Sequence, residues 1–212
     1  MSSVDVTRSA RKRNAILDAA TTVFLRNGYR GTSMDEIAAL AGVSKQTVYK
    51  HFADKERLFS KIVTGAVSDA ADPVHAGVLR LEETGEIEAD LRGLARQLLA
   101  SVIQPRILQL RRLVIAEAGR FPELGRTFYE QGPGRTIAAL ATVFERLAAR
   151  GALQLDDPQL AAAHFNWLVM SIPLNQAMFL GQDEARDAGE LDAYADAGVR
   201  AFLAAYAPRR TE

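Results

Sequence analysis

Apolar residues near the start of the chain recur with the spacing of a one-sided helix. Ile16, Ala19, Ala20 and Val23 follow the i, i+3, i+4, i+7 pattern, and Gly28 is typical of a residue that ends such a helix. Further along the chain, no run of β-branched residues alternates with polar ones. The pattern predicts an all-α fold.

The segment after this first helix predicts three helix starts at short intervals. Ser33 begins a capping-box pattern, Ser44 precedes a helix over Lys45–His51, and Asp54 precedes a longer helix. Gly42 lies in the turn between the first two of these helices. Two short helices joined by a tight turn that contains glycine are the outline of a helix-turn-helix motif.

The remaining pattern predicts how the chain is organised. Residues 1–9 are polar and are expected to form a disordered tail, residues 10–56 a helix-turn-helix domain, and residues 57–212 a second helical domain. Proline and glycine between residues 72 and 85 predict a loop. Beyond that loop, apolar periodicity predicts helices over residues 86–104, 105–120, 122–131, 133–150, 157–180 and 188–207.

The charge distribution indicates a partner for the first domain. The formal net charge of the whole chain is zero, but residues 1–60 hold ten Lys+Arg against six Asp+Glu. A basic N-terminal module on an acidic body favours contact with nucleic acid. The zero net charge argues against a non-specific architectural DNA-binding protein, which requires a strongly basic surface.

The composition argues against several other classes of protein. The chain has no cysteine and three scattered histidines, so we expect no metal and no cofactor. The uncharged stretch from Pro158 to Gln182 is interrupted by polar residues and is predicted to be a buried helix rather than a membrane span. No enzyme motif occurs, so we expect neither catalysis nor catalytic residues. A cytoplasmic location fits the absence of cysteine and of a signal-peptide core.

The helix over Lys45–His51 presents polar groups on one side. When Val48 is placed inward at 100° per residue, Gln46 and Lys50 point outward, with Thr47 and Tyr49 beside them. Amide, hydroxyl, phenol and ammonium groups bind base edges and phosphates. An ordinary solvated helix face is the alternative.

Two neighbouring helix starts are candidates for phosphate binding, because free N–H groups at a helix N-terminus attract anions. Lys55 follows the cap Asp54, although Glu56 beside it offers simple neutralisation. Thr32 and Ser33 precede the first short helix, and their hydroxyls and amides offer a second clamp. For Ser33, helix capping is the alternative role.

The residues from Gly28 to Phe59 resemble the DNA-binding domain of the TetR family of bacterial regulators. The resemblance implies homodimers, usually repressors, that small ligands release from DNA. Many members have glycine where this chain has Gln46, which favours a different operator preference. The resemblance implies that Lys45 and Gln46 contact bases. It also implies that Thr47, Tyr49, His51 and Lys55 contact DNA, chiefly at phosphates. The full predicted DNA-binding set is Thr32, Ser33, Lys45, Gln46, Thr47, Tyr49, Lys50, His51 and Lys55.

The body is similar to the AefR-like C-terminal branch of that family, over Arg112–Leu124, Phe128–Glu130 and Gly132–Pro133. The resemblance implies that the last two helices form a homodimer, and an entirely intramolecular core is the alternative. Polar residues within apolar segments predict a small-molecule site, although each of them singly fits ordinary core. The predicted ligand-binding residues are Phe121, His164, Asn166, Trp167, Met170, Asn175, Gln176 and Met178.

The sequence therefore predicts a one-component transcriptional regulator, most simply a repressor. It is expected to bind a palindromic operator in double-stranded DNA as a homodimer and to leave it when a small, largely apolar effector binds. An activator or a corepressor-dependent regulator of the same fold is the alternative. A non-specific DNA-binding protein and a helical enzyme are the alternatives of another class.

Overall fold

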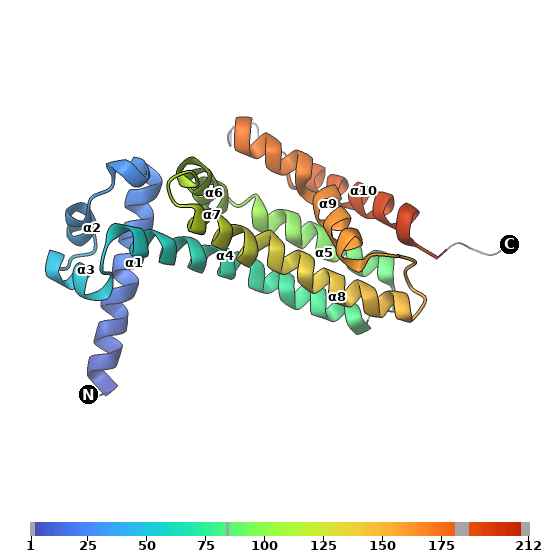
Figure 1. Cartoon of the computed structure of the whole chain (residues 1–212), viewed down its shortest axis with the longest axis horizontal. Coiled ribbons are helices and arrows are strands. Elements are labelled where there is room, and N and C mark those ends of the chain that lie inside the picture. The colour runs from blue at the N-terminus through green and yellow to red at the C-terminus, as the bar shows by residue number, and fades with distance from the viewer. Residues whose placement is uncertain (1–2, 84, 181–186, 209–212) are drawn as a thin grey trace. The chain divides into compact units, whose positions relative to one another are not determined.

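The computed structural model describes residues 3–83, 85–180 and 187–208, and the described part contains helices and no strands (Figure 1). The all-α prediction is confirmed. The helices are α1 (Ser3–Gly31), α2 (Met34–Leu40), α3 (Lys45–His51), α4 (Lys55–Arg80), α5 (Ile87–Val102), α6 (Pro105–Glu117), α7 (Pro122–Tyr129), α8 (Arg135–Ala149), α9 (Pro158–Leu180) and α10 (Ala188–Tyr206), with short helical turns η1 (Leu81–Glu83) and η2 (Glu130–Gly134).

The chain forms two compact units. The first comprises residues 1–66 and 109–128, and the second comprises residues 67–108 and 129–212. The sequence predicts a boundary at residue 56, whereas the first unit also takes the beginning of α4 and most of α6 and α7. Apolar periodicity reports which face of a helix is buried but not which distant segment covers it, so the 109–128 segment could not be assigned from the sequence.

Local chemistry explains the helices of the first unit. The Ser33 hydroxyl accepts a hydrogen bond from the Glu36 amide at 3.1 Å, and the Ser44 hydroxyl accepts one from the Thr47 amide at 3.2 Å. Gly42 has φ of 65°, a left-handed conformation in which glycine carries no steric cost, and it joins α2 to α3 within a few residues. The helix-turn-helix prediction is therefore confirmed at its caps and at its turn.

Two segments are more helical than the sequence predicts. Helix α1 begins at Ser3 rather than at residue 10, and residues 1 and 2 lie outside the described part. Helix α4 continues through Pro73 and Gly77 to Arg80, where the sequence predicts a loop. Val74 and Val78 are buried in the core of the second unit. This packing outweighs the tendency of Pro73 and Gly77 to break the helix.

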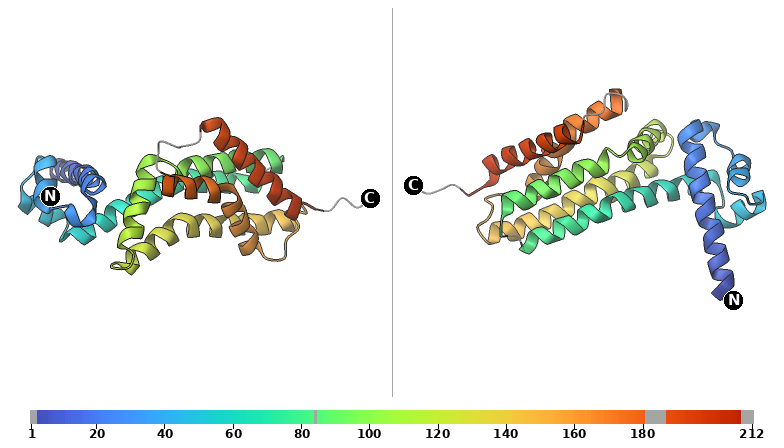
Figure 2. Two further views of the ribbon diagram at one scale, coloured as in Figure 1. Left: turned by 90° about the horizontal axis from the view of Figure 1, so that it is seen from above. Right: turned by 180° about the vertical axis from the view of Figure 1, so that it is seen from behind.

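The second unit is a bundle in which α9 packs on α8 and α10, and α5 packs on α10 and α9 (Figure 2). Its centre is an aromatic group from three helices, Phe144 of α8, Phe165 of α9 and Phe202 of α10, all fully buried. Gly198 lets α10 approach α9 closely, because a Cβ atom there would lie 3.0 Å from the Leu168 carbonyl oxygen. Within the described residues, no helix has the length and apolar character that a membrane crossing requires.

Candidate nucleic-acid interface

Helix α3 is held by two buried residues and presents polar ones. Val48 is completely buried and Phe52 at the C-cap is 6% exposed, while Gln46, Tyr49 and Lys50 are exposed. This is the orientation that the helical wheel predicts. A seven-residue helix is about 10 Å long, and the width of a B-DNA major groove admits such a helix.

Residues in the first turn of α3 form hydrogen bonds within the first unit. The hydroxyls of Ser44 and Thr47 lie 2.8 Å apart and share a hydrogen bond. Lys45 Nζ donates to the Asp35 carboxylate at 3.0 Å, and this hydrogen bond raises the pKa of Lys45. Both partners of the ion pair are exposed. A base contact by Lys45 must therefore compete with the carboxylate of Asp35 on α2.

The residues before α2 differ in their access to a partner. Thr32 is 4% exposed, and its hydroxyl donates to the Gly28 carbonyl oxygen at 2.7 Å. This differs from the expectation that the Thr32 hydroxyl clamps a phosphate. Ser33 is exposed and caps α2 through its oxygen, which leaves its O–H able to donate. His51 is half-buried beside Phe52, with ring centroids 6.5 Å apart.

Lys55 has a role inside the first unit. Its ammonium donates to the carbonyl oxygens of Tyr29 and Thr32, both at 2.8 Å, and lies 4.7 Å from the centre of the Tyr29 ring. Burial and, second, the nearby Arg120 lower the pKa of Lys55, while Glu117 opposes them. Lys55 thus joins the end of α1 to the start of α4 through two of its three N–H donors.

We expect Lys55→Met to lower the free energy of unfolding by about 1.5–3 kcal/mol, because two carbonyls lose their bonds to a charged donor. Urea denaturation followed by circular dichroism measures the change. Lys61→Met, on the exposed side of the same helix, is the control and should change stability by less than about 0.5 kcal/mol. Equal stability of the two variants would show that the Lys55 hydrogen bonds contribute nothing.

The sequence gives no sign of the aromatic cluster beside Lys55. The Tyr29 ring lies 5.9 Å from Phe24, 5.2 Å from Phe59 and 5.0 Å from Phe121. The Arg120 guanidinium lies 5.7 Å from the centre of the same ring. Phe121, predicted for ligand binding, therefore packs against the end of α1. A cavity of about 230 Å³ beside it is lined by Glu56, Phe59, Ser60, Arg120, Phe121, Pro122, Glu123, Leu124 and Thr127.

Two of the predicted ligand-binding residues meet inside the second unit. Asn166 is completely buried, and its amide nitrogen lies 4.0 Å from the sulfur of Met170, which is also buried. Among the residues that the structure describes, the buried amide oxygen Oδ1 of Asn166 has no hydrogen-bond partner. Leaving such an acceptor unpaired costs about 1–3 kcal/mol, so this atom is a candidate for binding a ligand donor.

The other predicted ligand-binding residues of α9 lie elsewhere on the helix. His164, Trp167 and Asn175 are exposed, and Gln176 and Met178 are half-buried. His164 Nδ1 lies 2.6 Å from the Tyr206 hydroxyl, and Asn175 donates to the Ser171 carbonyl oxygen at 2.7 Å. The structure therefore does not gather the predicted α9 residues into one place.

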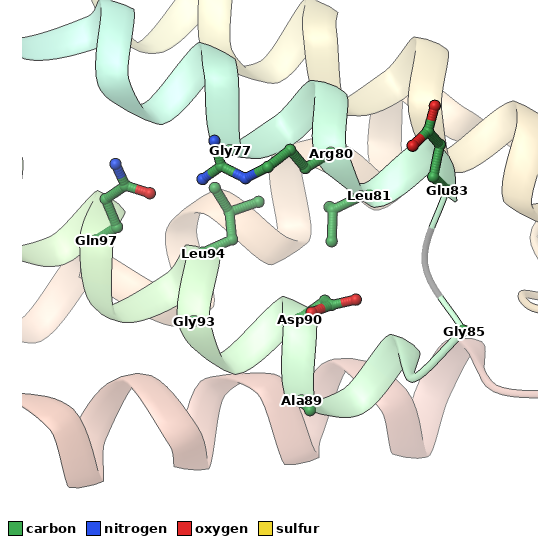
Figure 3. A pocket seen from close by; sticks show the side chains of 10 residues that line it. All are labelled: Gly77, Arg80, Leu81, Glu83, Gly85, Ala89, Asp90, Gly93, Leu94 and Gln97. Atoms are coloured by element: carbon green, nitrogen blue, oxygen red, sulfur yellow. The ribbon is translucent and has the colours of Figure 1, made fainter.

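A separate cavity of about 520 Å³ lies between α4 and α5 of the second unit (Figure 3). In Figure 3 Leu94 stands between the side chains of Gln97, Arg80 and Asp90, which come from both helices. None of the predicted ligand-binding residues lines it. Among the residues that the structure describes, no cluster of His, Cys, Asp and Glu could hold a metal ion.

Two family models match the chain. Residues 16–62 match the bacterial regulatory proteins of the tetR family, and residues 89–208 match the C-terminal domain of AefR-like transcriptional repressors. The second match alone covers more than half of the 212 residues. The two matches correspond to the helix-turn-helix and to most of the helical bundle.

Individual proteins agree with the family models. A protein described as a TetR-family transcriptional regulator from Mesorhizobium loti is 48% identical, with a TM-score of 0.88 over 94% of this chain and 98% of its own. The flavonoid-responsive regulator FrrA is 35% identical, with a TM-score of 0.73 over 94% and 99%. AcrR of Shigella flexneri, an HTH-type transcriptional regulator, is 34% identical over 105 residues, which are 50% of this chain and only 46% of AcrR. The chain thus matches less than half the length of AcrR. All three of these proteins are described as regulators.

Proposed function

The chain belongs to the TetR family of bacterial transcriptional regulators, and from this premise we propose that it is a repressor that binds a palindromic operator as a homodimer and is released by a small molecule. The exposed polar face of α3 carries this proposal. Gln46, Tyr49 and Lys50 face outward from a helix that Val48 and Phe52 anchor. The similarity of residues 89–208 to AefR-like repressors supports repression over activation.

The exposed face of α9 supports a homodimer. Leu168, Ile172 and Phe179 lie on one side of the helix and are 39%, 50% and 84% exposed. Residues 158–180 carry no charge, so this face is apolar and unusual for a solvated surface. The neighbouring helix α10 exposes the small residues Ala193 and Ala197, which permit close approach of another helix. We propose that a second copy of the chain covers α9 and α10 about a two-fold axis.

The unpaired amide oxygen of Asn166 supports a small-molecule effector. A buried acceptor among apolar residues is the kind of group that would pair with a hydroxyl or N–H donor on an otherwise apolar molecule. FrrA, 35% identical to this chain, is a flavonoid-responsive regulator. We therefore propose an aromatic effector with at least one hydroxyl donor and take flavonoids as the first compounds to test.

The decisive experiment selects random DNA duplexes with the purified full-length chain and sizes the bound complexes by light scattering. The proposal expects an enriched palindrome with half-sites about 34 Å apart or a multiple of it, bound by a dimer. Titration of flavonoids onto that complex should then release the DNA. Weak, salt-sensitive binding without an enriched sequence would contradict operator recognition. If the compound instead tightens DNA binding, the protein is a corepressor-dependent regulator and is not released by its effector.

We expect Gln46→Ala to relax base preference at one position of each half-site, at a cost of about 1–3 kcal/mol for each half-site of the best duplex. The reason is that the exposed Gln46 amide can both donate to and accept from a base edge. Repeating the selection with the variant measures the effect. Gln104→Ala, an exposed glutamine of the second unit, is the matched control. An unchanged base preference in Gln46→Ala would remove Gln46 from the interface.

A further inference from the structure

The N-terminal part of α1 is strongly basic. Arg8, Arg11, Lys12 and Arg13 follow one another within six residues, and no acidic residue occurs between Asp5 and Asp18. The first three are exposed and Arg13 is half-buried. Within the described ranges, none of the ion pairs includes any of these four cations. No carboxylate among the side chains that the structure describes therefore forms an ion pair with these four cations.

Arg13 places this basic segment beside the recognition helix. Its guanidinium lies 5.6 Å from the centre of the Phe52 ring, and Phe52 is the C-cap of α3. In Figures 1 and 2 the first turns of α1 extend beyond the end of α3, on the side of the unit that carries α2 and α3. A cation–π contact to a buried ring thus connects the basic segment to the end of the helix that carries the polar face.

Arg8 and Lys12 lie on the side of α1 that, from Ile16 onward, is buried within the first unit. They precede Ile16 and Ala20 in one i, i+4 row, and Ile16 and Ala20 are completely buried against the unit. Toward the N-terminal end of α1, this row changes from apolar to basic and becomes exposed. Arg8 lies about 7.5 Å along the helix axis from Arg13, which corresponds to about two base pairs of DNA at 3.4 Å each.

We infer that Arg8 and Lys12 form a second DNA contact, which binds phosphates flanking the groove that α3 occupies. Two like charges at i, i+4 repel each other and destabilise a helix, and a phosphate backbone reduces that repulsion. Arg13 is a positioning residue, because its ring contact orients the segment. The inference rests on the proposed DNA-binding function and extends it to residues outside the helix-turn-helix.

The test measures how the dissociation constant of a duplex depends on salt concentration, for the full-length protein and for Arg8→Gln/Lys12→Gln. Each lost phosphate contact lowers the slope of log K against log salt by about 0.9. Because the variant removes two contacts from each protomer of the proposed dimer, we expect a decrease of about 3.6. Specific and scrambled duplexes should weaken alike, because phosphates carry no sequence. Arg80→Gln/Arg106→Gln removes the same charge from exposed sites on α4 and α6 and should leave the slope unchanged.

A second measurement shortens the selected duplex by two base pairs at each end. Wild-type affinity should fall, and the affinity of Arg8→Gln/Lys12→Gln should not fall further. An unchanged slope in this variant, with circular dichroism showing intact helix, overturns the inference while operator binding stands. A wild type that selects no palindrome overturns the proposed function instead, and its slope on any duplex still decides whether Arg8 and Lys12 contact phosphate.

Discussion

Ile172→Arg should convert the protein to a monomer and lower its affinity for the selected operator by about 10³-fold or more, the usual ratio of specific to non-specific binding. Ile172 is 50% exposed in the middle of the apolar face of α9, between Leu168 and Phe179. In a two-fold dimer over this face, the substitution places two guanidinium groups close together in an apolar interface, where unpaired charge is costly. Light scattering and operator titration measure the two effects.

Leu79→Arg provides a closely matched control for this experiment. Leu79 on α4 is 51% exposed, so the same charge enters an equally exposed apolar site outside α9 and α10. We expect this variant to remain a dimer with wild-type operator affinity. If Ile172→Arg also remains a dimer at micromolar concentration, the exposed face of α9 is not the interface, whatever happens to DNA binding.

The helix-turn-helix could be predicted because its signals are local. Caps act over three residues, a left-handed glycine acts at one position, and the helical wheel needs only neighbours in sequence. Ser33, Ser44 and Gly42 therefore marked the short helices correctly. The burial of Val48 followed from the same periodicity.

Contacts between distant residues could not be predicted in this way. Lys55 reaches the carbonyls of Tyr29 and Thr32 across 26 and 23 residues of chain, and no pattern near Lys55 reports them. Phe121 meets Tyr29 across a still longer separation. For α9, an apolar helix with a few polar residues fits both a pocket and an interface. The structure buries Asn166 and exposes His164, a difference in surroundings that the sequence pattern does not report.

Phe202→Ala should lower the free energy of unfolding of the second unit by about 3–5 kcal/mol. Phe202 on α10 is completely buried, and its ring lies 5.1 Å from Phe144, 5.3 Å from Phe165 and 4.8 Å from Tyr206. The substitution removes these ring contacts and leaves a cavity where α8, α9 and α10 meet. Urea denaturation followed by circular dichroism measures the loss.

Phe202→Leu distinguishes the effect of lost side-chain volume on stability from the effect of losing the aromatic ring. Leucine fills most of the volume, so we expect a loss below about 1.5 kcal/mol. Because α10 also covers the buried side of α9, we expect Phe202→Ala to weaken the proposed dimer and, through it, operator binding, whereas Phe202→Leu should preserve both. An alanine variant with wild-type stability would mean that α10 can close the gap, and the aromatic group would then not be what holds α9 in place for a second copy.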